Sequence, residues 1–427
     1  MHQIVSASVE GFWGSHDFQF DLDRHVTFFI GQNGTGKTTL INLIAAALTA
    51  DFRTLDRMPF MKLTINLTAT KGNERPSITI QKSRKKGRPI ELMDYRINLG
   101  TPESKELRFS LDDNEEQMIV RRMQNELRYL DYYRRFQSGV GAELKKLVSV
   151  NWLSIHRGTS DKTSEGRQFD STVDQKIEAQ ANELVRYFAT FSKLKDDEIR
   201  VFQESFFTGL LEQSKPGDPI DFGRLEKVDD YKTALTTIFK ELHVVSDMSG
   251  LLHSFVEQAN QVQRRTKKSK SDPMTMDDFL FLKSLKRIED VVKRWEELQV
   301  RLNVIFAQQN SFQNIADQLF RKKRMKITPS NELQFISDNG KILTSQMLSS
   351  GEKQLLILMT EALLQRQEPA ILIADEPELS LHVLWQERLV GSLRALNPNA
   401  QLIVATHSPD IVGALGDRAI DMESLIK

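Results

Sequence analysis

Apolar and polar positions follow three different patterns along this chain of 427 residues. Near the N-terminus, residues 26–30 (VTFFI) form a short apolar run rich in β-branched and aromatic side chains, which predicts a buried strand. Residues 39–48 follow with the dense apolar face of a helix. Residues 62–110 alternate between apolar and polar with turn signals between the runs, which predicts a small antiparallel meander. We expect a helix over residues 123–148 and another buried strand over residues 150–155.

The middle of the chain, from about residue 171 to 326, has few glycines, more charge, and apolar residues three or four apart. The clearest of these apolar positions are Phe281, Leu285, Ile288, Val292 and Trp295, and the same seam continues to Leu319. This spacing predicts a long helix with a coiled-coil-like seam, packed against earlier helices at 174–194 and 231–260. Residues 263–273 are polar and basic and end in proline, so they predict a loop at the tip of a helical hairpin.

From residue 330 onwards the pattern returns to short apolar runs alternating with helical segments. The elements expected there are a helix at 355–365, a strand at 370–374, a helix at 384–396, a strand at 402–406 and a short strand at 418–421. The predicted fold class is therefore α/β, with a discontinuous core and a small antiparallel β subdomain. The core would comprise residues 1–165 and 330–427, and an all-helical insertion would occupy residues 166–329.

Composition narrows the class of protein only slightly. The chain has 58 basic and 58 acidic residues, so its formal net charge is zero and the overall charge does not predict a nucleic-acid partner. Without cysteine, disulfides and thiolate metal sites are excluded. No apolar run approaches the ~20 residues that cross a bilayer, and the first residues lack the pattern of a secretion signal. We expect a cytoplasmic protein with no membrane partner.

Residues 31–38 (GQNGTGKT) match the P-loop pattern, between an apolar strand and a helix. Glycines let the backbone wrap a phosphate with its N–H groups, and the N-terminal end of the helix favours an anion. The Lys37 side chain can reach the β- and γ-phosphates, and the Thr38 hydroxyl can ligate Mg²⁺. The residues expected to bind ATP here are Asn33, Gly34, Thr35, Gly36, Lys37, Thr38 and Thr39.

Two carboxylates follow the apolar run at 371–374, at the end of a strand where ligands bind in parallel sheets. Alone, an acidic strand end is usually a solvated turn. Beside a P-loop, it predicts that Asp375 holds Mg²⁺ and that Glu376 orients and deprotonates the attacking water. A further apolar run ends in Thr406 and His407, on what should be the neighbouring strand. A lone histidine is more often structural, but in this setting we expect His407 to sense the γ-phosphate.

Residues 348–354 (LSSGEKQ) open a helix with hydroxyls and backbone N–H groups that could face an anion. In isolation this segment could equally be a plain helix cap. Together with the P-loop, the acidic pair and His407, it resembles the signature of ABC ATPases in the form found in the SMC, RecF and OLD-like branch. Residues 375–382 (DEPELSLH) are similar to the D-loop region of that branch, although Val383 stands where proline is usual. The early glutamine of such proteins is not placed, and Arg157 is a candidate for a related role.

The resemblance covers the α/β core and implies a discontinuous ABC-type ATPase head. It implies two ATP molecules with Mg²⁺ between two heads, in a homodimer or a higher homo-oligomer. The residues that would reach the ATP of the other subunit are Ser349, Ser350, Gly351 and Glu352. Hydrolysis would then loosen the dimer, and the helical insertion would carry this change to a partner.

Three basic clusters, at residues 82–88, 264–270 and 321–326, each hold five cationic residues. A solvated surface and contact with a phosphate backbone remain open for them, so DNA is a candidate partner. Few aromatic residues are interleaved, which does not favour stacking on single strands.

The resemblance implies an ATPase that senses DNA or a foreign protein in anti-phage defence or DNA repair. OLD-like nucleases carry a Toprim domain after the ATPase core, whereas this chain ends 20 residues after His407. We therefore expect no nuclease activity here and a separate effector, a nuclease or toxin, as in two-gene systems of the PARIS or Septu kind. One alternative is an ATP-gated scaffold that sequesters a toxin with little turnover. Another is a transporter ATPase subunit, which the helical insertion and the DEPE form disfavour.

Overall fold

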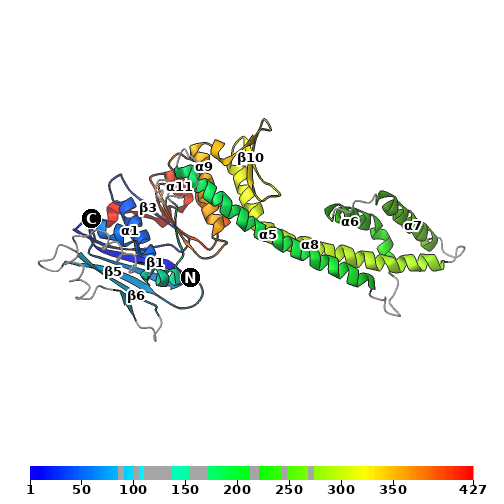
Figure 1. Ribbon diagram of the computed structural model, residues 1–427, viewed down its shortest axis with the longest axis horizontal. Coiled ribbons are helices and arrows are strands. Elements are labelled where there is room, and N and C mark those ends of the chain that lie inside the picture. The colour runs from blue at the N-terminus through cyan, green and yellow to red at the C-terminus, as the bar shows by residue number, and fades with distance from the viewer. Residues whose placement is uncertain are drawn as a thin grey trace, which may run out of the picture. The chain divides into compact units, whose positions relative to one another are not determined.

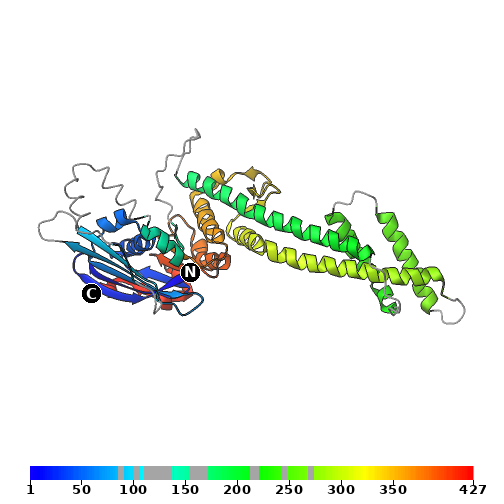
Figure 2. The same ribbon diagram turned by 60° about the horizontal axis from the view of Figure 1, so that its bottom comes forward.

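The computed structural model describes residues 1–84, 91–100, 106–109, 137, 139–153, 172–211, 221–242, 248–267 and 274–426. It contains two compact units, one made of Met1–Arg186 with Asn310–Lys427 and one made of Tyr187–Gln309. Figures 1 and 2 show the elements of both units in two views. Several expectations lie outside the described residues, namely most of the helix at 123–148, Arg157, and parts of the basic clusters at 82–88 and 264–270.

A five-stranded parallel sheet forms the centre of the first unit, in the order β14-β3-β13-β12-β8. Its strands are β3 (Val26–Ile30), β8 (Val150–Leu153), β12 (Ile371–Asp375), β13 (Gln401–Ala405) and β14 (Ala419–Asp421). All four pairings are parallel, and the inner strands are buried on both faces, which explains their continuous apolar runs. The sheet takes strands from both ends of the chain, so the predicted discontinuous α/β core is confirmed.

A second, antiparallel sheet has the order β2-β1-β4-β5-β6-β7. Its strands are β1 (His2–Phe12), β2 (His16–Asp21), β4 (Lys62–Ala69), β5 (Ser77–Arg84), β6 (Glu91–Asn98) and β7 (Leu107–Phe109). The meander predicted over residues 62–110 is confirmed as β4 to β7. The sheet is larger than predicted, because β1 pairs with β4 and extends the meander by two strands.

Helix α1 (Lys37–Thr49) packs against both sheets. One core cluster contains Leu43 of α1, Ile65 of β4 and Ile373 of β12. The buried hydroxyl of Tyr95 on β6 donates a hydrogen bond to the carbonyl of Ala47 in α1, and burial raises the pKa of this tyrosine. The short helix α2 (Phe52–Arg57) follows α1 (Figure 1). The antiparallel sheet therefore fixes the helix that begins at the P-loop.

The C-terminal part of the first unit adds helices and a small sheet. The helices are α9 (Ser350–Leu364), α10 (Val383–Leu396), α11 (Pro409–Val412) and α12 (Met422–Leu425), with the 3₁₀ turns η2 (Ser345–Met347) and η3 (Gly413–Arg418). Strands β9 (Lys323–Ile327), β10 (Leu333–Ser337) and β11 (Ile342–Leu343) form an antiparallel sheet. The sequence analysis missed these strands, because they are short and the first is mostly basic.

Two long helices, α5 (Thr172–Leu211) and α8 (Met276–Leu319), begin or end in the first unit and continue into the second. The second unit also contains η1 (Phe222–Lys227), α6 (Val228–Glu241) and α7 (Ser249–Lys267). The seam predicted on α8 is confirmed, since Phe281, Leu285 and Trp295 are buried against other helices of this unit.

Two helix boundaries differ from the sequence expectation. The helix expected over 231–260 is divided between α6 and α7. The predicted start of the loop at residue 263 is wrong, because α7 continues through Lys267. Arg265 there forms an ion pair with Asp278 on α8 at 2.9 Å, which supports helix where composition alone favoured a loop. No helix among the described residues is both long enough and apolar enough to cross a membrane.

Gln401 at the start of β13 joins the two sheets and offers a test of this arrangement. Its buried amide accepts a hydrogen bond from the Ile4 backbone N–H and donates one to the Ile4 carbonyl, both at 2.8 Å. Gln401→Ala should lower the free energy of unfolding by about 2–4 kcal/mol, because buried backbone groups lose their partners. Gln19→Ala, at an exposed position of β2, is the matched control and should change it by less than ~0.5 kcal/mol in urea titrations. Equal stability of the two variants would contradict this role.

Candidate functional site

The P-loop connects β3 to α1 and depends on glycines in left-handed backbone. Gly31, Gly34 and Gly36 have φ values of 139°, 86° and 89°, which other residues rarely adopt. Gly36 is also the residue before the first turn of α1. A cavity of about 900 Å³ opens beside this loop. Its lining includes the P-loop residues Asn33, Gly34, Gly36, Lys37, Thr38 and Thr39, with Glu376 and His407. We call this cavity the P-loop cleft.

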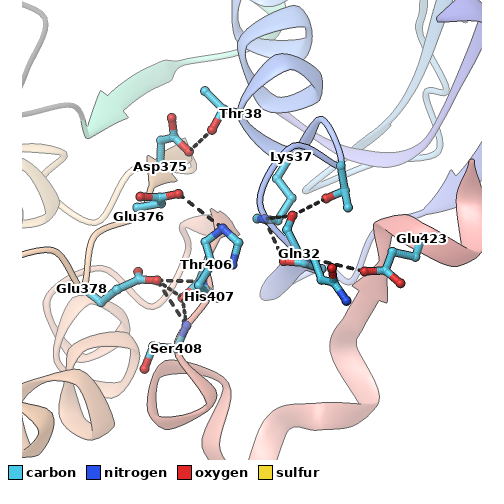
Figure 3. Close-up of polar contacts among 12 residues, drawn as sticks. Gln32, Lys37, Thr38, Asp375, Glu376, Glu378, Thr406, His407, Ser408 and Glu423 are labelled. Atoms are coloured by element: carbon cyan, nitrogen blue, oxygen red, sulfur yellow. Dashed lines mark hydrogen bonds and ion pairs between the residues drawn. The ribbon is translucent and has the colours of Figure 1, made fainter. Parts of the chain in front are cut away.

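Lys37 is turned back on its own loop (Figure 3). Its ammonium group donates to the carbonyl oxygens of Gly31 at 2.8 Å and Gln32 at 3.0 Å. Burial lowers the pKa of Lys37, while the carboxylates of Glu376 and Asp375 act in the opposite direction. The Lys37 ammonium group therefore bridges two carbonyl oxygens of the P-loop and lies near the carboxylates of Glu376 and Asp375.

The Thr38 hydroxyl donates a hydrogen bond of 2.9 Å to the Asp375 carboxylate (Figure 3). This contact joins the start of α1 to the end of β12, across 337 positions of sequence. One hydroxyl and one carboxylate suit Mg²⁺, which binds few protein oxygens and keeps water and phosphate ligands. The described residues contain no cluster of three or more His, Cys, Asp or Glu side chains that would form an all-protein metal cage. The donor set therefore fits Mg²⁺ bound together with a nucleotide.

Glu376 and His407 meet at the ends of β12 and β13. These strands are parallel neighbours, with Asp375 opposite Ala405, as the sequence analysis expected. The His407 Nε2 atom lies 3.5 Å from a Glu376 carboxylate oxygen. Glu376 has φ of 45°, an uncommon conformation for a residue with a side chain, and its backbone N–H donates to Ala405. Strained backbone of this kind concentrates at functional sites.

Glu378 was given no role in the sequence analysis, yet it organises the loop after β13. One carboxylate oxygen accepts hydrogen bonds from the Thr406 hydroxyl at 2.6 Å and the His407 backbone N–H at 2.7 Å. The Ser408 backbone N–H approaches the same oxygen at 3.2 Å (Figure 3). Glu378 lies in the same acidic motif as Asp375 and Glu376, which could have marked it as a candidate. Only the folded chain shows that its carboxylate binds the His407 backbone.

Trp13 is a second residue that sequence reasoning missed. It follows β1, lines the P-loop cleft and is 41% exposed, which is unusual for tryptophan. Its ring stacks on buried Phe12, with centroids 5.0 Å apart, and lies close to Gly36. Its φ of 52° is a costly conformation for a bulky side chain. The sequence carried no signal for this role, because Trp13 lies well before the P-loop in the chain and only the fold brings its ring beside Gly36.

The signature segment, residues 348–354, begins α9 but does not line the P-loop cleft. Ser349 and Ser350 are exposed, whereas Gly351 and Glu352 are buried. Ser349 and Glu352 form a capping box, and Lys323 pairs with the Glu352 carboxylate at 2.6 Å. Burial would raise the pKa of Glu352, but hydrogen bonds from Lys323 and Ser349 outweigh it and lower the pKa. Glu352 therefore faces inward, away from the surface that Ser349 and Ser350 present.

Helix α9 is attached to the loop that follows Glu376. The Gln354 amide donates to the Pro377 carbonyl at 2.8 Å. A Cβ atom placed on Gly351 would lie 2.4 Å from the Ser380 carbonyl oxygen, closer than such atoms approach. The signature segment is thus in direct contact with residues 376–382, which we call the acidic loop.

These features define an α/β protein with a parallel sheet and a phosphate-binding loop at its carboxyl edge. A family described as "AAA ATPase domain" matches residues 3–412, so the chain belongs to this family. It is accordingly an ATPase of the AAA type, a class that binds nucleotide and usually Mg²⁺.

One curated relative is the "Retron Vc95 probable ATPase" of Vibrio cholerae serotype O1 biovar El Tor. It is 26% identical over 143 residues, which is 27% of this chain and 28% of that protein. The chain thus matches less than a third of the length of that relative.

Solved structures with some likeness include two Smc head domains. One, from Pyrococcus furiosus, has an extended coiled coil and is bound to the C-terminal domain of ScpA. It has a TM-score of 0.46 and 13% identity, with 100% of this chain and 95% of that chain covered. The other, from Pyrococcus yayanosii, has a coiled coil and joint, a TM-score of 0.39 and 16% identity, over 96% of this chain and 93% of that chain.

Gly351 gives a direct test of the contact between α9 and the acidic loop. Gly351→Ala should lower the free energy of unfolding by about 1–3 kcal/mol, because the new methyl group must displace the backbone at Ser380. Gly391→Ala in α10 is the matched control, since nothing lies within 4 Å of its Cβ position. That variant should be neutral or more stable by up to ~1 kcal/mol through helix propensity. Similar melting curves for the two variants would count against the close contact.

Proposed function

We propose that the P-loop cleft binds and hydrolyses ATP, that two heads close around two ATP molecules, and that this cycle controls a separate effector. The observation that carries the proposal is the arrangement at one sheet edge, where Thr38 contacts Asp375 and Glu376 lies beside His407. The residue roles that follow are parts of this proposal.

The P-loop binds the phosphates. Backbone N–H groups of Asn33 to Thr39 and the N-terminal end of α1 supply partial positive charge. Lys37 exchanges its contacts with its own carbonyls for phosphate oxygens, and the nearby acids offset part of the lowering of its pKa by burial. Thr38 and Asp375 would hold Mg²⁺, which would supply positive charge to the phosphate oxygens when bound.

Glu376 accepts the proton of the attacking water, because it is the half-exposed carboxylate beyond the Mg²⁺ ligand and lines the same cleft. His407, 3.5 Å away, orients this water and the γ-phosphate. Glu378 acts through His407 as a positioning residue, since it binds the His407 backbone and leaves the imidazole directed at Glu376.

The dimer is supported by the position of the signature segment. Ser349 and Ser350 are exposed but do not line the P-loop cleft of their own subunit. Hydroxyls and N–H groups at the start of α9 are suited to an anion brought by a second head. We assign Gly351 to the close contact with the acidic loop and Glu352 to the support of Ser349, in place of the direct contacts with ATP that the resemblance implied for them. Hydrolysis on one side would then alter the contact with the other subunit.

The roots of the helical insertion are tied to helices α9 and α10 within the first unit. Lys353 on α9 pairs with Asp174 near the start of α5 at 2.7 Å. Trp385 on α10 donates to the Leu319 carbonyl, the last residue of α8, at 2.7 Å. These contacts support an insertion over about 166–329 that transmits ATP-dependent changes to a partner.

The proposed setting is anti-phage defence or DNA repair in the cytoplasm, with a separate nuclease or toxin as effector. Similarity to a probable retron ATPase supports a defence context. DNA contact is best supported at 321–326, where Arg321, Lys322, Arg324 and Lys326 are exposed. Lys82 and Arg265 of the other basic clusters are engaged within the protein.

Glu376→Gln tests both hydrolysis and the dimer. The variant should reduce kcat by roughly 10²- to 10⁴-fold, because the amide does not accept the proton, while ATP binding persists. ATP should then hold it as a dimer, measured by analytical ultracentrifugation. Glu387→Gln, an exposed position on α10, is the matched control and should keep normal turnover. Normal turnover of Glu376→Gln would remove Glu376 as the base, and a mass independent of ATP would argue against the sandwich.

Trp13 is expected to stack on the base of the bound nucleotide. Trp13→Ala should raise the Kd for ATP by roughly 5- to 150-fold, which corresponds to about 1–3 kcal/mol of stacking. It should leave the Kd for inorganic tripolyphosphate unchanged, and Trp13→Phe should keep most of the ATP affinity. Lys37→Ala should weaken binding of both ligands, as isothermal titration can measure. Equal losses for both ligands in Trp13→Ala would show that Trp13 supports the loop and does not contact the base.

A further inference from the structure

Gln386, near the start of α10, lines the P-loop cleft without belonging to any of the motifs that carry the proposed hydrolysis. It is half-buried, and both ends of its side-chain amide form hydrogen bonds. The amide nitrogen donates to the Leu381 carbonyl at 2.9 Å, and the amide oxygen accepts from the Ser408 hydroxyl at 2.6 Å. The side chain is therefore held at both ends by the protein.

The direction of each hydrogen bond follows from the partners. A backbone carbonyl only accepts, so the Gln386 nitrogen faces Leu381 and its oxygen faces Ser408. The Ser408 hydroxyl accepts a hydrogen bond from the Asp410 backbone N–H at 3.2 Å, which leaves its own proton for the Gln386 oxygen. The amide thus joins two segments of the chain in a single orientation.

The two segments that Gln386 joins carry the reacting groups of the cleft. Leu381 belongs to the acidic loop, which begins with Glu376. Ser408 directly follows His407 in the turn after β13. The side chains of Glu376 and His407 lie 3.5 Å apart, so a connection between the two segments bears on how these groups face each other.

Glu378 joins the same two segments at a different point. Its three hydrogen bonds to residues 406–408 all end on one carboxylate oxygen (Figure 3). Contacts that share one atom only weakly restrain rotation about that atom, whereas a connection at a second point removes this freedom. Gln386 supplies the second point, with Leu381 on one side and the Ser408 hydroxyl on the other.

The helical turn that carries Gln386 is itself anchored. The preceding residue, Trp385, donates from its indole nitrogen to the Leu319 carbonyl at 2.7 Å. Consecutive residues of a helix point about 100° apart, so Trp385 and Gln386 fix different sides of one turn. A side chain positions its neighbours accurately when its own support is rigid. The start of α10 meets this requirement.

We propose that Gln386 is a positioning residue for ATP hydrolysis, and that it keeps His407 and Glu376 in their mutual arrangement. It does so by tying residues 406–408 to the acidic loop, without touching the nucleotide. This role rests on the hydrolysis proposed above for the P-loop cleft. Since the P-loop binds the phosphates and the two loops carry the groups that act on water, loss of Gln386 affects turnover and not ATP affinity.

Gln386→Met removes both hydrogen bonds and keeps the length and helix propensity of the side chain. We expect kcat to fall by roughly 5- to 50-fold, as for the loss of one or two hydrogen bonds, while the Kd for ATP stays within about 2-fold. Gln318→Met, the same substitution at an exposed position of α8, is the matched control and should keep wild-type turnover. Unchanged kcat, or a loss confined to the Kd, would overturn the positioning role.

Ser408→Ala breaks the same hydrogen bond from the other side. Melting curves should first show that each variant is folded. The losses in kcat from Gln386→Met and Ser408→Ala should not multiply in the double variant, because both remove one connection. The cap that Ser408 provides for α11 is lost in the single and the double variant alike, so its effect cancels in this comparison. Losses that multiply would show that the two residues act independently, against the proposal.

The His407 imidazole gives a readout that needs no turnover. Its ring NMR signals in the nucleotide-free protein, assigned by their absence in His407→Gln, should shift in Gln386→Met and stay in place in Gln318→Met. Unshifted signals in Gln386→Met would overturn the positioning role, whether or not the protein hydrolyses ATP. Absence of hydrolysis by the wild type would instead contradict the proposed ATPase activity, and the NMR shift would still decide whether Gln386 positions His407.

Discussion

Parallel pairing of β3, β13 and β12 is the constraint on which the rest of this structure depends. It places the P-loop, the Asp375–Glu376 pair and the Thr406–His407 turn at one edge of a single sheet, although 337 positions separate Thr38 from Asp375. The hydrogen bond between Thr38 and Asp375 is the local result of that pairing. A shift of register by one residue would move every side chain of one of these strands to the opposite face of the sheet, where it would have to pack against different neighbours in a close-packed core.

The signature helix α9 connects the other parts of the first unit. Its first turn is held by a capping box and Lys323, its Gln354 binds the acidic loop, and its later residues contact α5 through Glu361. A displacement of α9 would therefore change the acidic loop and the base of α5 together. Tight packing favours discrete arrangements over gradual deformation, which suits a helix that contacts both the acidic loop at the P-loop cleft and the first turns of α5.

Much of the site followed from the sequence because each motif carries a local requirement. The glycines of the P-loop need left-handed backbone, and an apolar run ending in Asp375 and Glu376 predicts a buried strand with acids at its edge. The apolar seam of α8 likewise marks one helix face. Glu378 and Trp13 were missed, since the contact of Glu378 with His407 and that of Trp13 with Gly36 depend on which residues the fold brings near. The strands β9 to β11 were missed because their short, partly basic runs contain no clear alternation.

The sequence by itself determined the fold class, the strand and helix types of the core, and which polar residues follow the strands at the edge of the parallel sheet. These properties depend on the spacing of apolar, glycine and acidic residues over short stretches of the chain. Tertiary structure decided that Ser349 and Ser350 face outward while Glu352 faces inward, and that Glu378 holds the His407 backbone. The physical reason is that these relations join residues far apart in the chain, and only packing of the whole core brings them within hydrogen-bond distance.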